Sequence, residues 1–311
     1  MISVLGSGVA GLCAATALAE AGFAVELIAP EGAPPAASRL AGGMLAPFCE
    51  GEAAPETVVT RGQGAIGWWR AHSESFVARG TLVVAPARDS AELDRFARAT
   101  RGHDWVDPGV LEPGLAGRFA RGLFFATEAH VTPVTALSEL RAGLARRGVA
   151  IHGGAPRGRI VDCRGLSSGD RLPDLRPVRG EMLELFAPDV TFTRPLRLLH
   201  PRFPCYLVPR GGGRFMLGAT MVESARPGPI TARAAMELLS AAYTLHPALA
   251  EAEILSTGTG LRPAFPDNIP EIRREGDRLH LNGLYRHGFL MAPVLALDLV
   301  ALLQKETADA H

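Results

Sequence analysis

The sequence has no excess of charge of either sign. Its 32 basic and 32 acidic residues balance in a chain of 311, so no basic surface that binds nucleic acid or an anionic membrane is expected. Cysteine is also sparse, since only Cys13, Cys49, Cys163 and Cys205 are present and none forms a CxxC pair. This scatter is typical of buried free thiols. We therefore predict no metal centre, no nucleic-acid partner and no membrane partner.

Long apolar runs are missing as well, because no uninterrupted apolar segment reaches the length needed to span a bilayer. The first twenty residues are apolar, but no Lys or Arg precedes them and a glycine-rich turn interrupts them, unlike a secretory signal. With 47% hydrophobic and 21% charged residues and no low-complexity tract, the composition is that of a globular protein of about two domains. We expect a cytoplasmic location.

A glycine-rich turn follows the apolar segment 1–5 and leads into an Ala- and Leu-rich stretch. Each glycine has a physical reason: Gly6 permits a tight turn, Gly8 lets the backbone approach a pyrophosphate, and Gly11 lets a helix pack closely on the strand. The start of the helix then offers free amides and a positive dipole end to the phosphates. The turn predicts a dinucleotide site and leaves NAD, NADP and FAD open. Its candidate cofactor-binding residues are Gly6, Gly8, Val9, Ala10 and Gly11.

The segment Phe23–Ile28 is predicted to form the second strand of a parallel unit. In the usual dinucleotide-binding pattern an acidic residue ends this strand and accepts the ribose hydroxyls. Here that place is Ala29, followed by Pro30 and Glu31. Either Glu31 takes the role from a displaced loop, or the contact is absent.

Alternating patterns farther along predict strands of a different kind at 81–85 and 181–186, and a hairpin of 205–208 with 214–217 around a glycine-rich turn. These segments favour an antiparallel sheet that is separate from the parallel one. The predicted fold class is therefore α/β, with a Rossmann-like nucleotide-binding domain and a second, mostly antiparallel β-sheet domain that carries helices.

Several further segments, together with the opening turn, resemble one known family in their order and spacing. On these motifs the chain resembles the flavin-dependent D-amino-acid oxidase superfamily, and is most similar to the glycine oxidases of thiamine biosynthesis. The segments are Ala37–Pro47, His130–Pro133, Val178–Glu181, Tyr206–Arg210, Leu217–Met221, Gly260–Pro263 and Tyr285–Pro293.

The resemblance implies a cofactor and a division of the chain. It implies an FAD-binding domain of residues 1–76, 131–176 and 256–311, and a substrate domain of residues 77–130 and 177–255. No residue suggests covalent attachment, so we expect non-covalent FAD. Beyond the opening turn and Glu31, the residues implied to bind it are Ser38, Arg39, Gly42, Gly43, Met44, Leu45, Gly165, Arg262, Arg286, His287, Gly288, Phe289 and Leu290.

The resemblance also implies a substrate pocket lined by Tyr206, Met221, Arg262 and Arg286, with Arg262 holding the substrate carboxylate. A guanidinium suits that role because it makes two parallel hydrogen bonds to a carboxylate. The implied reaction is oxidation of glycine, a small amine or a D-amino acid by hydride transfer to flavin. Dioxygen then reoxidises the flavin and gives hydrogen peroxide, and the imine product serves thiazole assembly for thiamine.

Two other functions remain open at this point. One is an oxidase or dehydrogenase of N-methyl amino acids, such as sarcosine, and the other is a non-catalytic flavin-binding partner subunit. A homo-oligomer is compatible with the resemblance, since related oxidases commonly assemble. The chain departs from the family between Ile151 and Arg159, where a longer strand-rich excursion is usual. How the adenosine half of FAD is held is therefore left unassigned.

Overall fold

The parallel sheet that the opening turn predicts is present in the computed structural model, which describes residues 1–30, 32, 36–202 and 204–309. The strand order is β16-β17-β9-β1-β2-β8. All neighbours are parallel except β16 and β17, which form an antiparallel hairpin. The strands are β1 (Ile2–Leu5), β2 (Val25–Ile28), β8 (Ala150–His152), β9 (Arg159–Asp162), β16 (Glu271–Glu275) and β17 (Arg278–Asn282).

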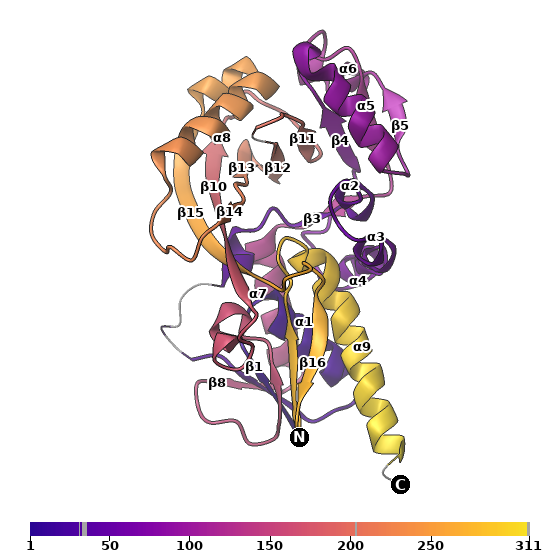
Figure 1. Ribbon diagram of the computed structural model, residues 1–311, viewed down its shortest axis with the longest axis vertical. Coiled ribbons are helices and arrows are strands. Elements are labelled where there is room, and N and C mark those ends of the chain that lie inside the picture. Colours follow the sequence, from indigo (N-terminus) through magenta and orange to yellow (C-terminus); the bar gives the residue numbers. More distant parts are fainter. Residues whose placement is uncertain (31, 33–35, 203, 310–311) are drawn as a thin grey trace.

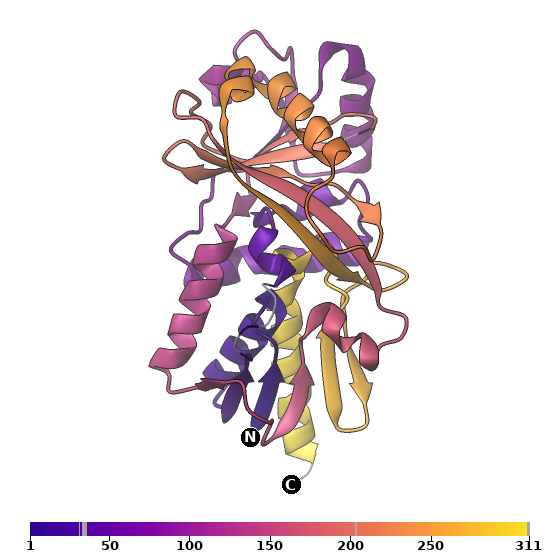
Figure 2. The ribbon, with the colours of Figure 1, turned by 90° about the vertical axis from the view of Figure 1, so that its left-hand side faces the viewer.

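Helices α1 and α9 pack on this sheet in the lower half of the molecule, and α3, α4 and α7 pack in turn on these two helices (Figures 1 and 2). Helix α1 is buried from Val9 to Leu18, because it is apolar on all sides and contacts both α7 and α9. Burial of these faces is the main driving force for this part of the fold. The helices are α1 (Val9–Glu20), α3 (Glu56–Gly62), α4 (Gly64–His72), α7 (Pro133–Arg146) and α9 (Gly288–Asp309).

Helix α9 has 22 residues and a mean hydropathy of 1.6 over its most apolar window, so by length and composition it could cross a membrane. Half of that window is buried inside the protein. Its residues Phe289, Leu295 and Leu299 belong to the same core cluster as Leu12 and Leu18 of α1. Core packing thus accounts for the apolar character of the helix.

The second sheet fills the upper half of the molecule and is mostly antiparallel (Figure 1). Its strand order is β14-β10-β13-β12-β11-β4-β6-β5, with β15 paired to β10, and only β4 and β11 run parallel. The predicted hairpin is present as β12 and β13. The strands are β4 (Thr81–Val84), β5 (Asp104–Val106), β6 (Gly122–Phe125), β10 (Arg176–Phe186), β11 (Leu196–Leu198), β12 (Cys205–Gly211), β13 (Arg214–Gly218), β14 (Val222–Glu223) and β15 (Glu253–Ala264).

Two helices cover this sheet: α8 contacts β10, β12 and β13, and α5 contacts β6. Short elements connect the two halves, including the small β3–β7 pair. The remaining elements are α2 (Pro47–Glu50), α5 (Ser90–Ala99), α6 (Pro108–Leu111), α8 (Ala232–Leu245), β3 (Met44–Leu45), β7 (Ala129–His130), and the 3-10 turns η1 (Ala37–Leu40), η2 (Ala87–Asp89), η3 (Pro113–Leu115), η4 (Gly165–Asp170) and η5 (Pro247–Glu251).

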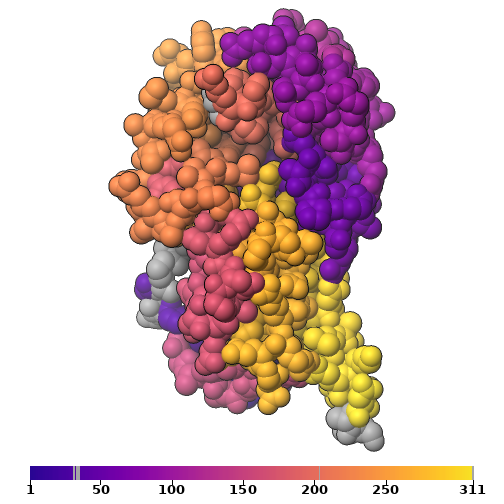
Figure 3. All heavy atoms as spheres, viewed as in Figure 1, coloured from indigo at the N-terminus to yellow at the C-terminus, as the bar shows by residue number. Residues whose placement is uncertain are grey.

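The chain passes between the two halves several times. The paired strands β10 and β15 run from the upper half down to the lower one (Figure 2). The space-filling view shows the purple and orange segments side by side in the upper half, with the yellow α9 at the lower end (Figure 3). The predicted domain limit at 255/256 falls inside β15, and the division into domains stays a prediction.

The glycine-rich turn between β1 and α1 has the tight geometry that its spacing predicts. Gly6 has φ +101°, and a Cβ there would lie 2.8 Å from the carbonyl oxygen of Cys163. A Cβ at Gly11 would overlap the carbonyl oxygen of Gly6. Glycine is therefore required at both positions, and its absence of a side chain sets how closely α1 approaches β1.

We predict that Gly11→Ala lowers the free energy of unfolding by roughly 1–3 kcal/mol, because the added methyl forces α1 away from β1. Gly67→Ala is the matched control: Gly67 lies in α4 and a Cβ there meets nothing within 4 Å, so alanine should stabilise by up to ~1 kcal/mol. Urea denaturation followed by circular dichroism measures both. Equal stability of the two variants would contradict the steric argument.

Candidate active site

A cavity of about 1510 Å³ reaches from the β1–α1 turn to the β12 and β15 strands of the second sheet. Of the residues predicted for the site, Gly11 and Leu45 do not line it: Gly11 packs on Gly6, and Leu45 is fully buried in the core. Glu31 lies outside the described residues. The predicted residues that do line the cavity are Gly6, Gly8, Val9, Ala10, Ser38, Arg39, Gly42, Gly43, Met44, Gly165, Tyr206, Met221, Arg262, Arg286, His287, Gly288, Phe289 and Leu290.

The phosphate end of the cavity is made of close-packed backbone. The hydroxyl of Ser38 accepts a hydrogen bond from Val9 N at 3.2 Å, which joins the 37–40 turn to the start of α1. A Cβ at Gly8 would lie 3.3 Å from Ser38 Oγ. Farther along the cavity, toward Tyr206, a Cβ at Gly43, which has φ +69°, would overlap the carbonyl oxygen of Val131. An elongated cavity with such a glycine-lined end fits a dinucleotide.

Arg210 in β12 holds the glycine loop in place, a role that the sequence did not indicate. Its guanidinium donates to the carbonyls of Val131 at 3.1 Å, Ala41 at 3.2 Å and Gly42 at 2.9 Å. Burial lowers the pKa of Arg210 to about 10, so the group remains charged at neutral pH. A side chain of the second sheet therefore fixes a loop that lines the cavity next to Tyr206.

Arg262 and Tyr206 lie at the other end of the cavity. One nitrogen of Arg262, Nη1, donates to the carbonyl of Thr220 at 3.1 Å, and the guanidinium covers Gly180, where any Cβ would overlap it. Among the described residues no carboxylate pairs with Arg262, so its charge is open to a ligand in the cavity. Burial raises the pKa of Tyr206, which keeps its phenol protonated as a donor.

Arg286 differs from Arg262 because it has an internal partner, Glu50 at the end of α2. Arg286 Nη2 lies 3.1 Å from Glu50 Oε2, and His287 Nδ1 lies 3.4 Å from the same oxygen. Burial opposes the charge of Glu50, but Arg286, His287 and Arg197 outweigh it and lower its pKa. Sequence reasoning missed Glu50, since no spacing rule links it to Arg286.

Met221 lies against this pair at the mouth of the site. Its sulfur is 3.5 Å from Arg286 Nη1 and 3.5 Å from the Tyr285 hydroxyl. Because 49% of Met221 remains exposed, the side chain belongs to the wall of the cavity and not to the packed core.

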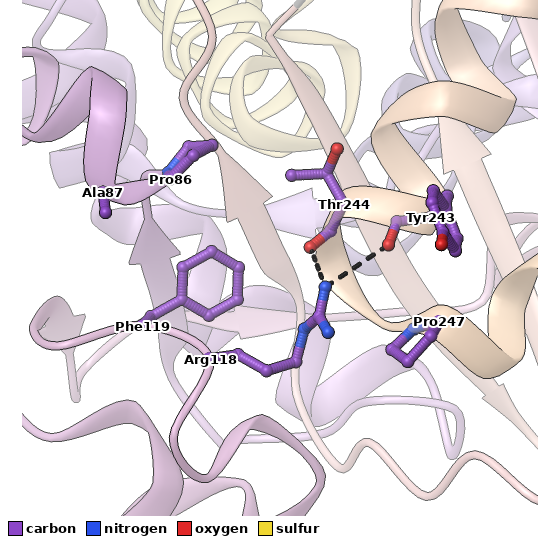
Figure 4. A pocket seen from close by; sticks show the side chains of 7 residues that line it. All are labelled: Pro86, Ala87, Arg118, Phe119, Tyr243, Thr244 and Pro247. Atoms are coloured by element: carbon purple, nitrogen blue, oxygen red, sulfur yellow. Dashed lines mark hydrogen bonds between the residues drawn. The ribbon is translucent and has the colours of Figure 1, made fainter.

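A smaller hollow of about 300 Å³ lies far from these residues, beside the end of α8 (Figure 4). Arg118 reaches across it and donates to the carbonyls of Thr244 at 2.8 Å and Leu245 at 2.9 Å. These carbonyls end α8 without helical partners, so the guanidinium serves as a helix cap. The guanidinium of Arg118 is thus already hydrogen-bonded within the protein, and this hollow is not a candidate active site.

A parallel sheet with a phosphate-binding turn, and a cavity shared with an antiparallel sheet, define a dinucleotide-dependent enzyme. Comparison with known proteins gives the family: residues 1–302 match the family described as DAO, FAD dependent oxidoreductase. The chain belongs to this family. It is an oxidoreductase, and its cofactor is FAD.

Relatives of known name agree with this assignment. The chain is 53% identical over 316 residues to a candidate thiamine biosynthesis oxidoreductase, ThiO, of Rhizobium etli, covering 98% of this chain and 97% of the relative. It is 27% identical over 349 residues to a glycine oxidase of Pseudomonas aeruginosa, covering 94% and 91%. The crystal structure of glycine oxidase from Geobacillus kaustophilus superposes with a TM-score of 0.81 at 22% identity, over 98% of this chain and 94% of that one.

Glu128 is a second buried acid near the site. Its Oε1 accepts a hydrogen bond from Cys49 N at 2.8 Å, next to Glu50. Burial raises the pKa of Glu128 to about 7, against an ordinary value of 4.5. Between these two pH values the folded protein binds a proton that the unfolded chain does not, so stability falls as pH rises through this window.

We predict that Glu128→Gln removes this pH dependence, because an amide oxygen still accepts from Cys49 N but does not ionise. The variant should gain stability relative to the parent protein between pH 5 and pH 8. Denaturant unfolding at the two pH values measures the difference. A stability difference that stays constant with pH would contradict the assignment.

Proposed function

We propose that this enzyme oxidises glycine, a small amine or a small D-amino acid, and that the imine product serves the thiazole branch of thiamine biosynthesis. The observation that carries the proposal is Arg262, which has no carboxylate partner in the described part of the chain and lies near Tyr206 in the cavity that the glycine turn also lines. The 53% identity to the ThiO protein of R. etli supports the biosynthetic role.

The two arginines of the substrate end have different tasks. Arg286 is neutralised by Glu50, whereas Arg262 has a backbone carbonyl as partner and keeps its charge for a ligand. A carboxylate that binds Arg262 therefore completes a buried ion pair, which a neutral amine cannot do. This favours a substrate that carries a carboxylate next to its amine.

The roles of the remaining residues follow from this anchor. Tyr206, protonated at neutral pH, can donate its hydroxyl to the same carboxylate. Two contacts to one carboxylate fix the position of the α-carbon in the cavity, and such positioning is a large part of catalysis when few proton transfers are needed. Bound FAD would supply the acceptor for the hydride of the α-carbon, and dioxygen would take the two electrons onward to give hydrogen peroxide.

Residues of the first sheet and of the start of α9 would hold the cofactor. The backbone of Gly6 to Ala10 and the Ser38 hydroxyl lie at the phosphate end, and Gly42 to Met44 and Arg286 to Leu290 lie along the cavity toward Tyr206. Oriented backbone dipoles there can stabilise the negative charge of reduced flavin. We further propose that FAD is non-covalent, that the enzyme acts in the cytoplasm and that it forms a homo-oligomer.

The purified yellow protein, mixed with glycine in air, tests the activity directly. In the absence of oxygen, we expect glycine to bleach the flavin absorbance. In air, we expect the reaction to produce hydrogen peroxide, ammonia and glyoxylate. Sarcosine and D-alanine complete the panel. Bleaching without peroxide would indicate a different electron acceptor, and no bleaching by any amine would indicate a non-catalytic flavoprotein.

We predict that Arg262→Ala raises the KM for glycine by about a hundredfold, since loss of a buried charge-assisted pair costs ~2–5 kcal/mol. Arg214→Ala is the control, because Arg214 lies on β13 with an exposed side chain paired to Glu184. Oxidation of an amine without a carboxylate should be unaffected by either change. An unchanged KM for glycine in the Arg262 variant would remove Arg262 from the substrate site.

We predict that acid precipitation of the protein leaves the yellow colour in the supernatant, because no covalent bond holds the flavin. The absorbance of supernatant and pellet measures the distribution. Colour retained in the washed pellet would show a covalent flavin and would leave the amine oxidation unaffected.

A further inference from the structure

At the end of the cavity next to β2, the position where the usual pattern places a carboxylate is Ala29, and among the described residues that follow β2 up to 30 there is no acid. Strand β2 ends at Ile28, and Ala29 and Pro30 follow as cavity-lining residues. An acid at this place ordinarily accepts the ribose hydroxyls of a bound dinucleotide. The short β8–β9 connection starts beside this position, since Ala29 N donates to the carbonyl of His152 at 2.8 Å, and its residues Gly153, Gly154 and Pro156 line the cavity.

An acid is present two residues before the end of the strand, and it is buried. Glu26 lies inside β2 and has no exposed surface. Strand alternation points it to the opposite side from Leu27, which packs in the core with α1. Ser3, its neighbour across the parallel pair, donates its hydroxyl to Glu26 Oε1 at 2.6 Å. Glu26 therefore does not face the cavity itself.

The carboxylate of Glu26 binds both ends of the β8–β9 connection. At one end, Arg157 donates its backbone amide to Oε1 at 2.7 Å and its Nε to Oε2 at 2.6 Å. At the other end, His152 Nε2 lies 3.1 Å from Oε2. Burial opposes the charge of Glu26, but these hydrogen bonds outweigh it and lower its pKa to about 2. The group is thus fully ionised at neutral pH.

His152 links Glu26 to the backbone of the β8–β9 connection. Gly154 N donates to His152 Nδ1 at 3.1 Å. Since Nδ1 accepts there, the ring proton lies on Nε2, which makes the contact to Glu26 a donated hydrogen bond. The Ser3 hydroxyl also accepts from Gly158 N at 2.8 Å. A single carboxylate and its serine neighbour therefore set the position of the whole connection on the sheet.

We propose that Glu26 is a positioning residue for the adenosine half of FAD: by holding residues 153–158 on β1 and β2, it makes their backbone the wall that receives this half. The connection then takes the place of the acid that β2 lacks at its end. Arg141 of α7, which lines the same end without a partner among the described residues, supplies a charged group there. The inference rests on FAD being non-covalent, as proposed above.

Binding of FAD to the apoprotein tests this, with Glu26→Gln compared to Glu20→Gln. Glu20 is the matched control because it also pairs with a histidine and an arginine, His72 and Arg147, but on the surface away from the cavity. We expect Glu26→Gln to raise the Kd for FAD roughly tenfold, the effect of losing about one charge-assisted hydrogen bond. Glu20→Gln should leave the Kd unchanged.

Amide hydrogen exchange with and without FAD locates the effect. In the parent protein FAD should protect the amides of 153–158 as well as those of 6–11 and 42–44. In Glu26→Gln the protection should be lost at 153–158 and kept at the other two segments. Arg157→Gln, whose side chain is 57% exposed, should show the same pattern more weakly and serves if the first variant does not fold.

Three results would overturn the proposal. They are an absence of protection at 153–158 in the parent protein, an unchanged Kd in both variants, and an equal loss of protection in all three segments, which indicates general unfolding. A flavin that acid cannot release would show covalent attachment instead. In that case, amide exchange at 153–158 in the holoenzyme variants would still measure whether Glu26 holds this segment in place.

Discussion

The close contact between helix α1 and strand β1 is the constraint on which the rest of the structure depends. It requires glycine at positions 6 and 11, because a side chain at Gly11 would overlap the carbonyl of Gly6. The helix fixed in this way is buried against α9, and a Cβ at Gly288 would lie 3.4 Å from Val9. Two segments near opposite ends of the chain are thereby placed on one cavity. Small changes in the turn should therefore propagate to residues 286–290.

At the substrate end of the cavity, Arg262 has no carboxylate partner among the described residues, whereas the arginines near it are engaged by other groups of the protein. Arg286 is paired with Glu50, and Arg197 donates to Glu52 at 2.7 Å. Arg210 is used by backbone carbonyls of the glycine loop. Arg262 has no carboxylate among the described residues, and this selects anionic ligands more sharply than the overall charge of a site does. The choice of ligand at the substrate end thus depends on which arginine there lacks a carboxylate partner.

Much of the fold and the cofactor-binding turn could be predicted from local sequence. The tight packing at Gly6 and Gly11 and the alternation in β12 and β13 each depend on residues close in the chain, and the fold confirms them. The order of the family motifs extends over the whole chain, and the family match confirms it. The replacement of the usual acid at the end of β2 by Ala29 was visible in the same way. The use of Glu26 in its place was not, because Arg157 lies 131 residues away and reaches it only through the β8–β9 connection.

The sequence by itself determined the class of fold, since the fold follows from backbone geometry that particular residue types impose locally, and it determined the FAD family through the order and spacing of motifs along the whole chain. Tertiary structure alone decided how the charges of the site are paired. Glu50 and Arg286 are 236 residues apart, and no periodicity brings such groups together. Whether an arginine is free or neutralised depends on its neighbours in space, because the energy of a buried charge is set by what lies within a few ångströms of it.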